Sequence, residues 1–186
     1  MEHIVSKKVS PVPRGYRTAT TCLTVVDVDA AIAFYQAAFG AEVLTRQTAI
    51  DCDYAIHATI KIGNSIIAVN QEAPELGILS PWRLGASISQ VHLYVADVDA
   101  SWERAVEAGA IVHAPVYDAY WGDRTGVLAD GNGYLWSIAS RVENVSQQEI
   151  AARARAALET PAEAPLEAVY QDWAVDAVAA GQSVVA

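Results

Sequence analysis

Two histidines, His57 and His92, have side chains suited to proton transfer, because imidazole titrates near neutral pH. Each lies in a run of alternating polar and apolar residues that predicts a β-strand. Two interpretations stay open for each ring. It could act as a general acid or base, or it could be a hydrogen-bonded strand histidine that only orients polar neighbours. The pattern places no carboxylate beside either ring, so it favours ligand contact over catalysis.

Aromatic side chains gather in two stretches rich in loop-forming residues. Tyr117, Tyr120 and Trp121 precede Arg124, and Trp82 lies in another loop. Aromatic rings beside an opening suit flat or apolar ligands, and the Arg124 guanidinium could pair with an anionic group. The alternative is structural: Trp121 would close the edge of the core, and Arg124 with the preceding aspartate would stabilise the start of a strand.

An internal repeat supplies the elements that would position these residues. Residues 24–31 (TVVDVDAA) and 94–101 (YVADVDAS) both combine a β-rich run with D-V-D-A and the start of a helix. Asp29 and Asp99 are expected to cap these two helices, because an aspartate carboxylate accepts the first free helical N–H groups. Each helix is expected to end at a glycine.

Strand signals follow each helix, so both copies are predicted to run strand, helix and three strands. The later strands are expected at 42–47, 54–62 and 65–70 in the first copy, and at 111–115, 125–129 and 134–140 in the second. The predicted fold class is therefore α+β: two tandem βαβββ modules that form a curved mixed sheet around a small-molecule cavity, plus C-terminal helices.

The expected organisation has six parts. They are an N-terminal arm (1–17), the first module (18–72), an inter-module loop (73–87), the second module (88–140), a C-terminal helix (141–159) and a final segment (160–186). The C-terminal helix opens with a capping-box pattern at Ser146 and Glu149. The final segment is predicted to hold a linker, a short amphipathic helix around 166–173 and a tail.

The composition limits the partners of this chain. Its 186 residues carry 12 basic and 22 acidic side chains, a net charge of −10, and 53% of them are hydrophobic. Without a basic stripe, neither nucleic acid nor an anionic membrane surface is an expected partner. The sequence has no apolar run long enough to span a bilayer and no signal-peptide pattern, so the expected location is cytoplasmic. Cys22 and Cys52 are expected to be free and mostly buried.

Six ordered segments carry a family resemblance. They are DVDAAIAFY (27–35), FGAEV (39–43), HATIKIGNS (57–65), HLYVADVD (92–99), WGDRTG (121–126) and GYLWSI (133–138). They resemble the vicinal oxygen chelate superfamily, the glyoxalase, bleomycin-resistance and extradiol-dioxygenase group, and within it the glyoxalase-like branch. The resemblance covers about 18–156 and implies a homodimer of two-module chains. It leaves activity open, because the superfamily holds both metal-dependent enzymes and metal-free proteins that sequester drugs.

The resemblance also implies where a metal would bind. Metal-dependent members place one His, Gln or Glu ligand on the first and last strand of each module. By this register the four positions fall at Thr20, Ile67 or Ala68, Gln90 and Ser137. Only Gln90 could serve as a ligand, and a two-residue shift that brings in Cys22 and His92 still supplies no carboxylate. We therefore expect no metal and no other cofactor, with a divalent metal as the disfavoured alternative.

Period-two alternation predicts which residues line the cavity. The helix-facing set is Leu23, Val25, Val91, Leu93, Val95, Trp136 and Ile138. The opposite set is Thr20, Cys22, Thr24, His57, Thr59, Gln90, His92, Tyr94, Leu135, Ser137 and Ala139. From this set and the loops, the predicted ligand-binding residues are Thr20, Cys22, Gln90, Tyr94, Tyr120, Trp121, Arg124, Ser137 and Trp82.

These residues leave three functions open. The favoured one is a metal-free protein that binds a small hydrophobic or aromatic molecule. The second is a metal-dependent lyase, isomerase or dioxygenase of the superfamily. The third is a metal-free isomerase or cyclase with His57 or His92 as the base. The sequence does not decide whether the chain is an enzyme.

Overall fold

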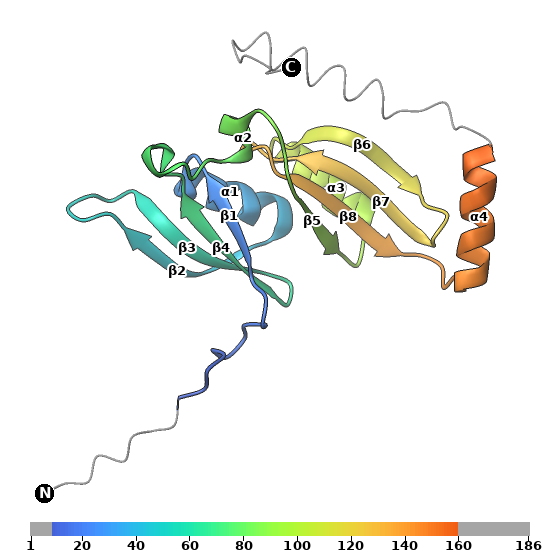
Figure 1. Cartoon of the computed structure of the whole chain (residues 1–186), viewed down its shortest axis with the longest axis horizontal. Coiled ribbons are helices and arrows are strands. Elements are labelled where there is room, and N and C mark those ends of the chain that lie inside the picture. Colours follow the sequence, from blue (N-terminus) through green and yellow to red (C-terminus); the bar gives the residue numbers. More distant parts are fainter. Residues whose placement is uncertain (1–8, 160–186) are drawn as a thin grey trace, which may run out of the picture.

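The computed structural model describes residues 9–159 and contains two successive βαβββ units (Figure 1). The first unit comprises β1 (Thr21–Val25), α1 (Val28–Phe39), β2 (Glu42–Thr48), β3 (Ala55–Ile62) and β4 (Ser65–Gln71). The second comprises β5 (Gln90–Tyr94), α3 (Val98–Glu107), β6 (Ile111–Asp118), β7 (Asp123–Ala129) and β8 (Leu135–Arg141). Between them lie the 3₁₀ turn η1 (Pro74–Leu76) and the short helix α2 (Pro81–Leu84), and α4 (Gln147–Glu159) follows.

Each module forms its own four-stranded mixed sheet. The strand orders are β1-β4-β3-β2 and β5-β8-β7-β6, so the two modules repeat one topology. The first strand of each module pairs in parallel with the last, and the remaining pairs are antiparallel. The α+β class and the two tandem modules predicted from the repeat are confirmed, with one sheet per module.

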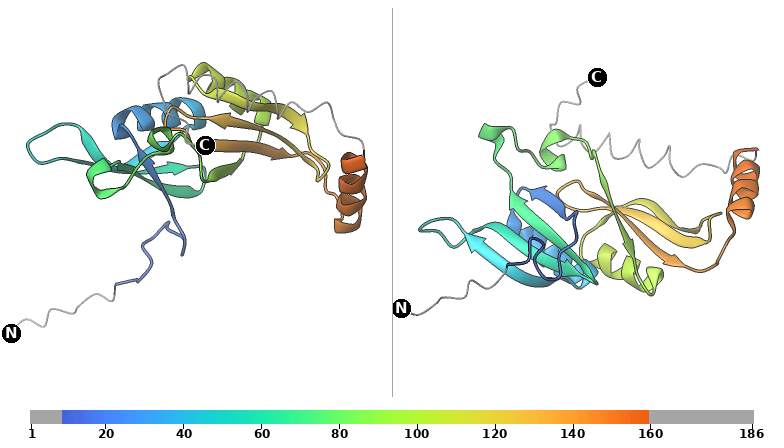
Figure 2. Two further views of the ribbon diagram at one scale, coloured as in Figure 1. Left: turned by 45° about the horizontal axis from the view of Figure 1, so that its top comes forward. Right: turned by 60° about the horizontal axis from the view of Figure 1, so that its bottom comes forward.

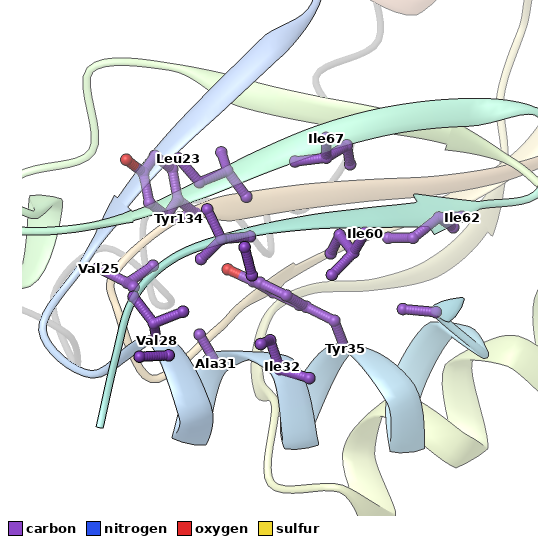
Figure 3. Packing of buried hydrophobic residues seen from close by; sticks show 14 of the residues in the cluster. Leu23, Val25, Val28, Ala31, Ile32, Tyr35, Ile60, Ile62, Ile67 and Tyr134 are labelled. Carbon is purple, nitrogen blue, oxygen red and sulfur yellow. The ribbon is translucent and has the colours of Figure 1, made fainter. Parts of the chain in front are cut away.

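The helices α1 and α3 lie on the same side of the two sheets and pack against each other (Figure 2). The strands therefore bury one face and leave the other turned away from the helices; we call the second face the open face. Alternate residues meet the helix side, as the sequence predicts: Leu23, Val25, Trp136 and Ile138 are each at most 1% exposed. Figure 3 shows the α1 residues Val28, Ala31, Ile32 and Tyr35 packed beneath β1, β3 and β4.

The hairpin between β7 and β8 joins the second module to the first. The backbone N–H of Thr24 donates to the Tyr134 hydroxyl at 2.7 Å, and that of Val26 donates to Asn132 Oδ1 at 3.0 Å. These contacts pair the N–H of Thr24, in the edge strand β1, and that of Val26, directly after it, with acceptors, so this end of the edge is covered within the chain.

A buried carboxylate completes this junction. Asp130 is 2% exposed, and its Oδ2 accepts hydrogen bonds from the Tyr35 hydroxyl and from Trp136 Nε1, both at 2.9 Å. Trp136 packs against Tyr35 and Phe39 of α1 with ring centroids 5.2 and 4.7 Å apart. The core therefore forms two clusters, and each contains buried residues of both modules: Trp136 lies in the first cluster and Ala38 in the second.

Two expectations from the sequence are wrong. The helices are capped by Asp27 and Asp97, whose extended backbone lets Oδ1 accept from the N–H three residues later. Asp29 and Asp99 lie in the first helical turn and bind arginines instead. Both cysteines are free, as predicted, but exposed. Cys22 is on the open face, and Cys52 lies in the β2–β3 loop.

The C-terminal helix begins at the expected capping box, where Ser146 Oγ accepts from the Glu149 N–H at 3.2 Å. The predicted amphipathic helix around 166–173 lies outside the described residues. Between residues 9 and 159, no helix has the length and apolar character needed to cross a membrane.

Candidate functional site

The open face of the second sheet brings several predicted site residues into one row. In the β5–β8 ladder, Gln90 lies opposite Leu135, His92 opposite Ser137, and Tyr94 opposite Ala139. Gln90, His92 and Tyr94 are all exposed, because no helix covers this face. The row therefore offers an amide, an imidazole and a phenol along one strand.

Each candidate histidine is held by the strand beside it. His92 Nδ1 lies 2.9 Å from Ser137 Oγ, and His57 Nδ1 lies 2.7 Å from Asn70 Oδ1. Among residues 9–159, neither ring has a hydrogen bond or ion pair with a carboxylate. The histidines belong to different sheets, so the structure does not bring them together. Neither of the two cavities described below is lined by both.

The buried carboxylate of Asp123 fixes the aromatic side chains at the far end of this row. Asp123 is 1% exposed, and its Oδ2 accepts from the Tyr94 hydroxyl at 2.8 Å and from Trp121 Nε1 at 2.9 Å. Its Oδ1 forms an ion pair with Arg141 Nε at 2.5 Å. The Tyr120 ring stacks edge-on against Trp121 at 4.8 Å. This cluster supports the structural role of Trp121 at the edge of the core.

Arg124 is engaged within the chain. Its Nε and Nη2 donate to the two oxygens of Asp99 at 2.9 and 2.7 Å, and its Nη1 donates to Asp118 at 3.2 Å. The hydrogen bond from Arg124 lowers the pKa of Asp99. The guanidinium therefore ties the start of α3 to β6, and contact with an anionic ligand stays a prediction.

A cavity of about 300 Å³ lies at the other end of the open face. Its wall includes Ile111, Ala129 and Leu135, which are consecutive partners across β6, β7 and β8. Trp82 and His113 complete the lining. Burial lowers the pKa of His113, so this imidazole is neutral near pH 7. Trp82 was predicted from the sequence as a ligand-binding residue, whereas His113 was not, because its place depends on a register shift in β6.

Contacts with the β7–β8 hairpin and with Glu72 hold the helix α2 over this cavity. The Trp82 N–H donates to the Asn132 carbonyl at 2.8 Å. A Cβ at Gly133, where φ is +81°, would lie only 2.8 Å from the Trp82 nitrogen. The buried Glu72 carboxylate also accepts from the N–H and hydroxyl of Ser80 and pairs with Arg83. The hairpin and the Glu72 carboxylate together fix the position of the backbone of Trp82.

A larger cavity of about 960 Å³ lies between the two modules. Its lining combines Phe39 of α1, the β3–β4 turn, residues 92–97 and Arg104 of α3. The predicted site residues therefore divide among several places: Trp82 lines the smaller cavity; His92 and Tyr94 line the larger one; Thr20, Cys22, His57, Gln90, Tyr120, Trp121, Arg124 and Ser137 line neither.

The four family metal positions do not form a suitable donor set. Cys22 pairs with Ala68 across β1 and β4, and His92 pairs with Ser137 across β5 and β8. Neither pair contains a carboxylate. Within the described part of the chain, no three His, Cys, Asp or Glu side chains are grouped so that they could hold an ion. The residues present do not fit the divalent ion of metal-dependent relatives.

The tandem βαβββ modules, with one cavity at the open face of the second sheet and one between the modules, define a glyoxalase-like α+β protein. The family model of the Glyoxalase/Bleomycin resistance protein/Dioxygenase superfamily matches residues 17–138, and the chain belongs to this superfamily. An uncharacterized protein of Mycobacterium tuberculosis is 39% identical over 133 residues, which cover 70% of this chain and 78% of that protein.

Solved structures share the same fold. TioX from Micromonospora sp. ML1 is 29% identical, with a TM-score of 0.54 over 67% of this chain and 99% of that one. The fosfomycin resistance protein FosX from Listeria monocytogenes, solved with Mn(II) and sulfate, is 18% identical, with a TM-score of 0.52 over 74% of this chain and 97% of that one. The FosX similarity concerns the fold alone.

Proposed function

We propose that the chain is a metal-free binding protein for a small hydrophobic or aromatic molecule. The cavity of about 300 Å³ beneath Trp82 carries this proposal. Its size falls at the lower end of typical ligand sites, which are mostly apolar with a few polar groups. Ile111, Ala129 and Leu135 supply the apolar wall, and His113 supplies a polar group. A flat ring of one or two cycles suits this volume.

The exposure of Trp82 supports the proposal. Its side chain is 49% exposed although the helix that carries it is held firmly by Glu72 and the β7–β8 hairpin. When a ligand covers a large aromatic surface that is exposed to water, binding is favoured by about 25 cal/mol per Å² of apolar area buried. The neutral His113 imidazole is compatible with an apolar ligand, because binding does not desolvate a charge there.

Thermal unfolding with a panel of planar aromatic compounds tests this function. A true ligand should raise the unfolding temperature equally with and without EDTA. Trp82→Ala should abolish the shift, whereas Tyr54→Ala, which removes another half-exposed ring outside the cavity, should leave it unchanged. Turnover of the bound compound, or loss of the shift in EDTA, would overturn the proposal.

A metal-free enzyme is the second candidate, and His92 is the observation that favours it. Its ring is exposed on the open face, contacts Tyr94 edge-on at 4.7 Å and lines the larger cavity. His57 is half-buried and lines neither cavity. His92→Ala should then abolish turnover while binding persists. Metal analysis of untagged protein separates both candidates from a metal-dependent lyase, isomerase or dioxygenase, which requires a stoichiometric divalent ion.

We further propose that two copies pair in the cytoplasm. All seven residues of the edge strand β2 are exposed, including the apolar Val43 and Leu44. An exposed edge strand with apolar side chains is a ready surface for a second chain. Sedimentation equilibrium should give twice the chain mass, and Leu44→Lys should shift the protein toward the monomer.

A further inference from the structure

The repeat makes a direct comparison of the two edge strands possible. At the end of β1, the outward N–H groups of Thr24 and Val26 are occupied by the second module's hairpin: the first donates to a phenol oxygen and the second to a carboxamide oxygen. These acceptors belong to Tyr134 and Asn132. The chain therefore shows which chemical groups fit the edge of a first strand in this fold.

The equivalent groups in the second module are the N–H groups of Tyr94 and Ala96. They precede the cap Asp97 by three residues and one residue, as Thr24 and Val26 precede Asp27. The Val95 N–H donates to the Ala139 carbonyl of β8. Because alternate N–H groups of a strand point to opposite sides, that of Tyr94 points away from β8, toward the open edge of the sheet. The Ala96 N–H lies in the bend after β5, at the position that Val26 occupies in the bend after β1.

Between residues 9 and 159, nothing covers this edge in the same way, and a difference in loop length explains why. Five residues, 130–134, connect β7 to β8, whereas only Gly63 and Asn64 connect β3 to β4. The longer hairpin reaches β1. The shorter one leaves the cavity of about 960 Å³ between itself and β5, with Gly63, Asn64 and residues 92–97 on its walls.

The remaining walls indicate what else the cavity accepts. Phe39 and Leu93 provide apolar surface, and the exposed Arg104 provides a cation at the rim. The Asp97 carboxylate accepts from the Ala100 N–H as the helix cap, so that oxygen is already engaged. A ligand in this cavity would therefore find hydrogen-bond donors at the edge of β5 and apolar contact with Phe39 and Leu93.

We propose that this inter-module cavity is a second ligand site, for a small aromatic amide. Its carboxamide and hydroxyl oxygens would accept from the Ala96 and Tyr94 N–H groups, as Asn132 and Tyr134 accept from β1. Donors two residues apart along the chain are separated by at most roughly 7 Å, a span that such a molecule covers. The site is distinct from the cavity beneath Trp82 and does not depend on it.

The probe that tests the site is N-acetyl-L-tyrosinamide, which carries a phenol and two amide oxygens. Titration followed by ¹⁵N–¹H spectra should shift the amide signals of Tyr94 and Ala96 most. Ala96→Pro removes one donor without breaking a hydrogen bond of the β5–β8 ladder. It should lower the affinity for the probe at least about tenfold, since a hydrogen bond to the probe is lost. The control Ala96→Val retains the N–H and should bind the probe as the parent protein does.

A loop graft gives an independent test that does not rely on proline. Replacing Gly63-Asn64 with the sequence of residues 130–134 should fill the cavity from within, abolish probe binding and raise the unfolding temperature. Trp82→Ala should leave probe binding intact, which separates this site from the proposed function. Shifts centred outside residues 92–97, or full probe affinity in both Ala96→Pro and the graft, would overturn the proposal.

Discussion

The Tyr35 hydroxyl donates to Asp130 Oδ2 at 2.9 Å across 95 residues of sequence, so a helix of the first module is bonded to a hairpin of the second. Asp130 also accepts from the Tyr134 and Asn132 N–H groups through its other oxygen. Burial raises the pKa of this carboxyl. This one carboxylate therefore accepts hydrogen bonds from the first module, through Tyr35, and from three donors of the second.

Removing one of these donors should loosen the junction. Tyr35→Phe leaves a buried acceptor with one fewer partner, and we expect it to lower the free energy of unfolding by about 1–3 kcal/mol. Asp130→Asn should lower the free energy of unfolding by at least as much, because its amide N–H₂ would replace one acceptor oxygen and face N–H or O–H donors. Urea denaturation measures both effects. The control Tyr54→Phe concerns a half-exposed ring and should change stability by less than about 0.5 kcal/mol.

The Glu72 carboxylate should control ligand binding through α2. The Arg83 guanidinium holds the pKa of Glu72 below its usual range, with further hydrogen bonds from Ser80. A depressed pKa means that this stabilisation is present above pH 4.5, the usual pKa of a glutamate, and is lost as pH falls through the folded-state pKa. Glu72→Gln should weaken ligand binding under Trp82 at pH 7, measured by calorimetry. Unchanged affinity would show that α2 does not need this anchor.

His113 should make stability depend on pH near and below 6.5, the usual pKa of a histidine. Burial lowers its pKa from 6.5, so the unfolded chain binds more protons than the native protein in this window. The free energy of unfolding should therefore fall as pH is lowered below 6.5. His113→Gln cannot titrate and should show a shallower dependence in urea titrations at several pH values. Identical slopes for the two proteins would contradict this assignment.

Two glycines of one loop provide a matched pair of substitutions. An added Cβ at Gly133 would meet the Trp82 nitrogen at 2.8 Å and sit at a φ of +81°, whereas the same atom at Gly131 has nothing within 4 Å. Gly133→Ala should destabilise the protein by more than about 1 kcal/mol and change the Trp82 fluorescence, because α2 has to move. Gly131→Ala should leave both the unfolding temperature and the emission spectrum near those of the parent protein.

Local sequence features predicted the secondary structure and the orientation of the strands. The repeated D-V-D-A segments located both βαβββ units, and alternation placed Leu23 and Trp136 toward the helices, where they are buried. Such patterns depend on residues a few positions apart, so one sequence contains them. The helix caps were assigned two residues too late, because Asp27 and Asp29 have the same side chain and only backbone geometry distinguishes them.

The tertiary structure alone decided which side chains meet. A register shift in β6 places His113 in the lining of the smaller cavity. Asp123 accepts hydrogen bonds from Tyr94 and Trp121, and Asp130 links the two modules by accepting from Tyr35. These contacts link residues from different strands and loops, so no short-range pattern predicts them. The sequence determined the two modules and their uncovered faces. Strand register and loop length, which bring distant residues together, determined where a ligand could bind.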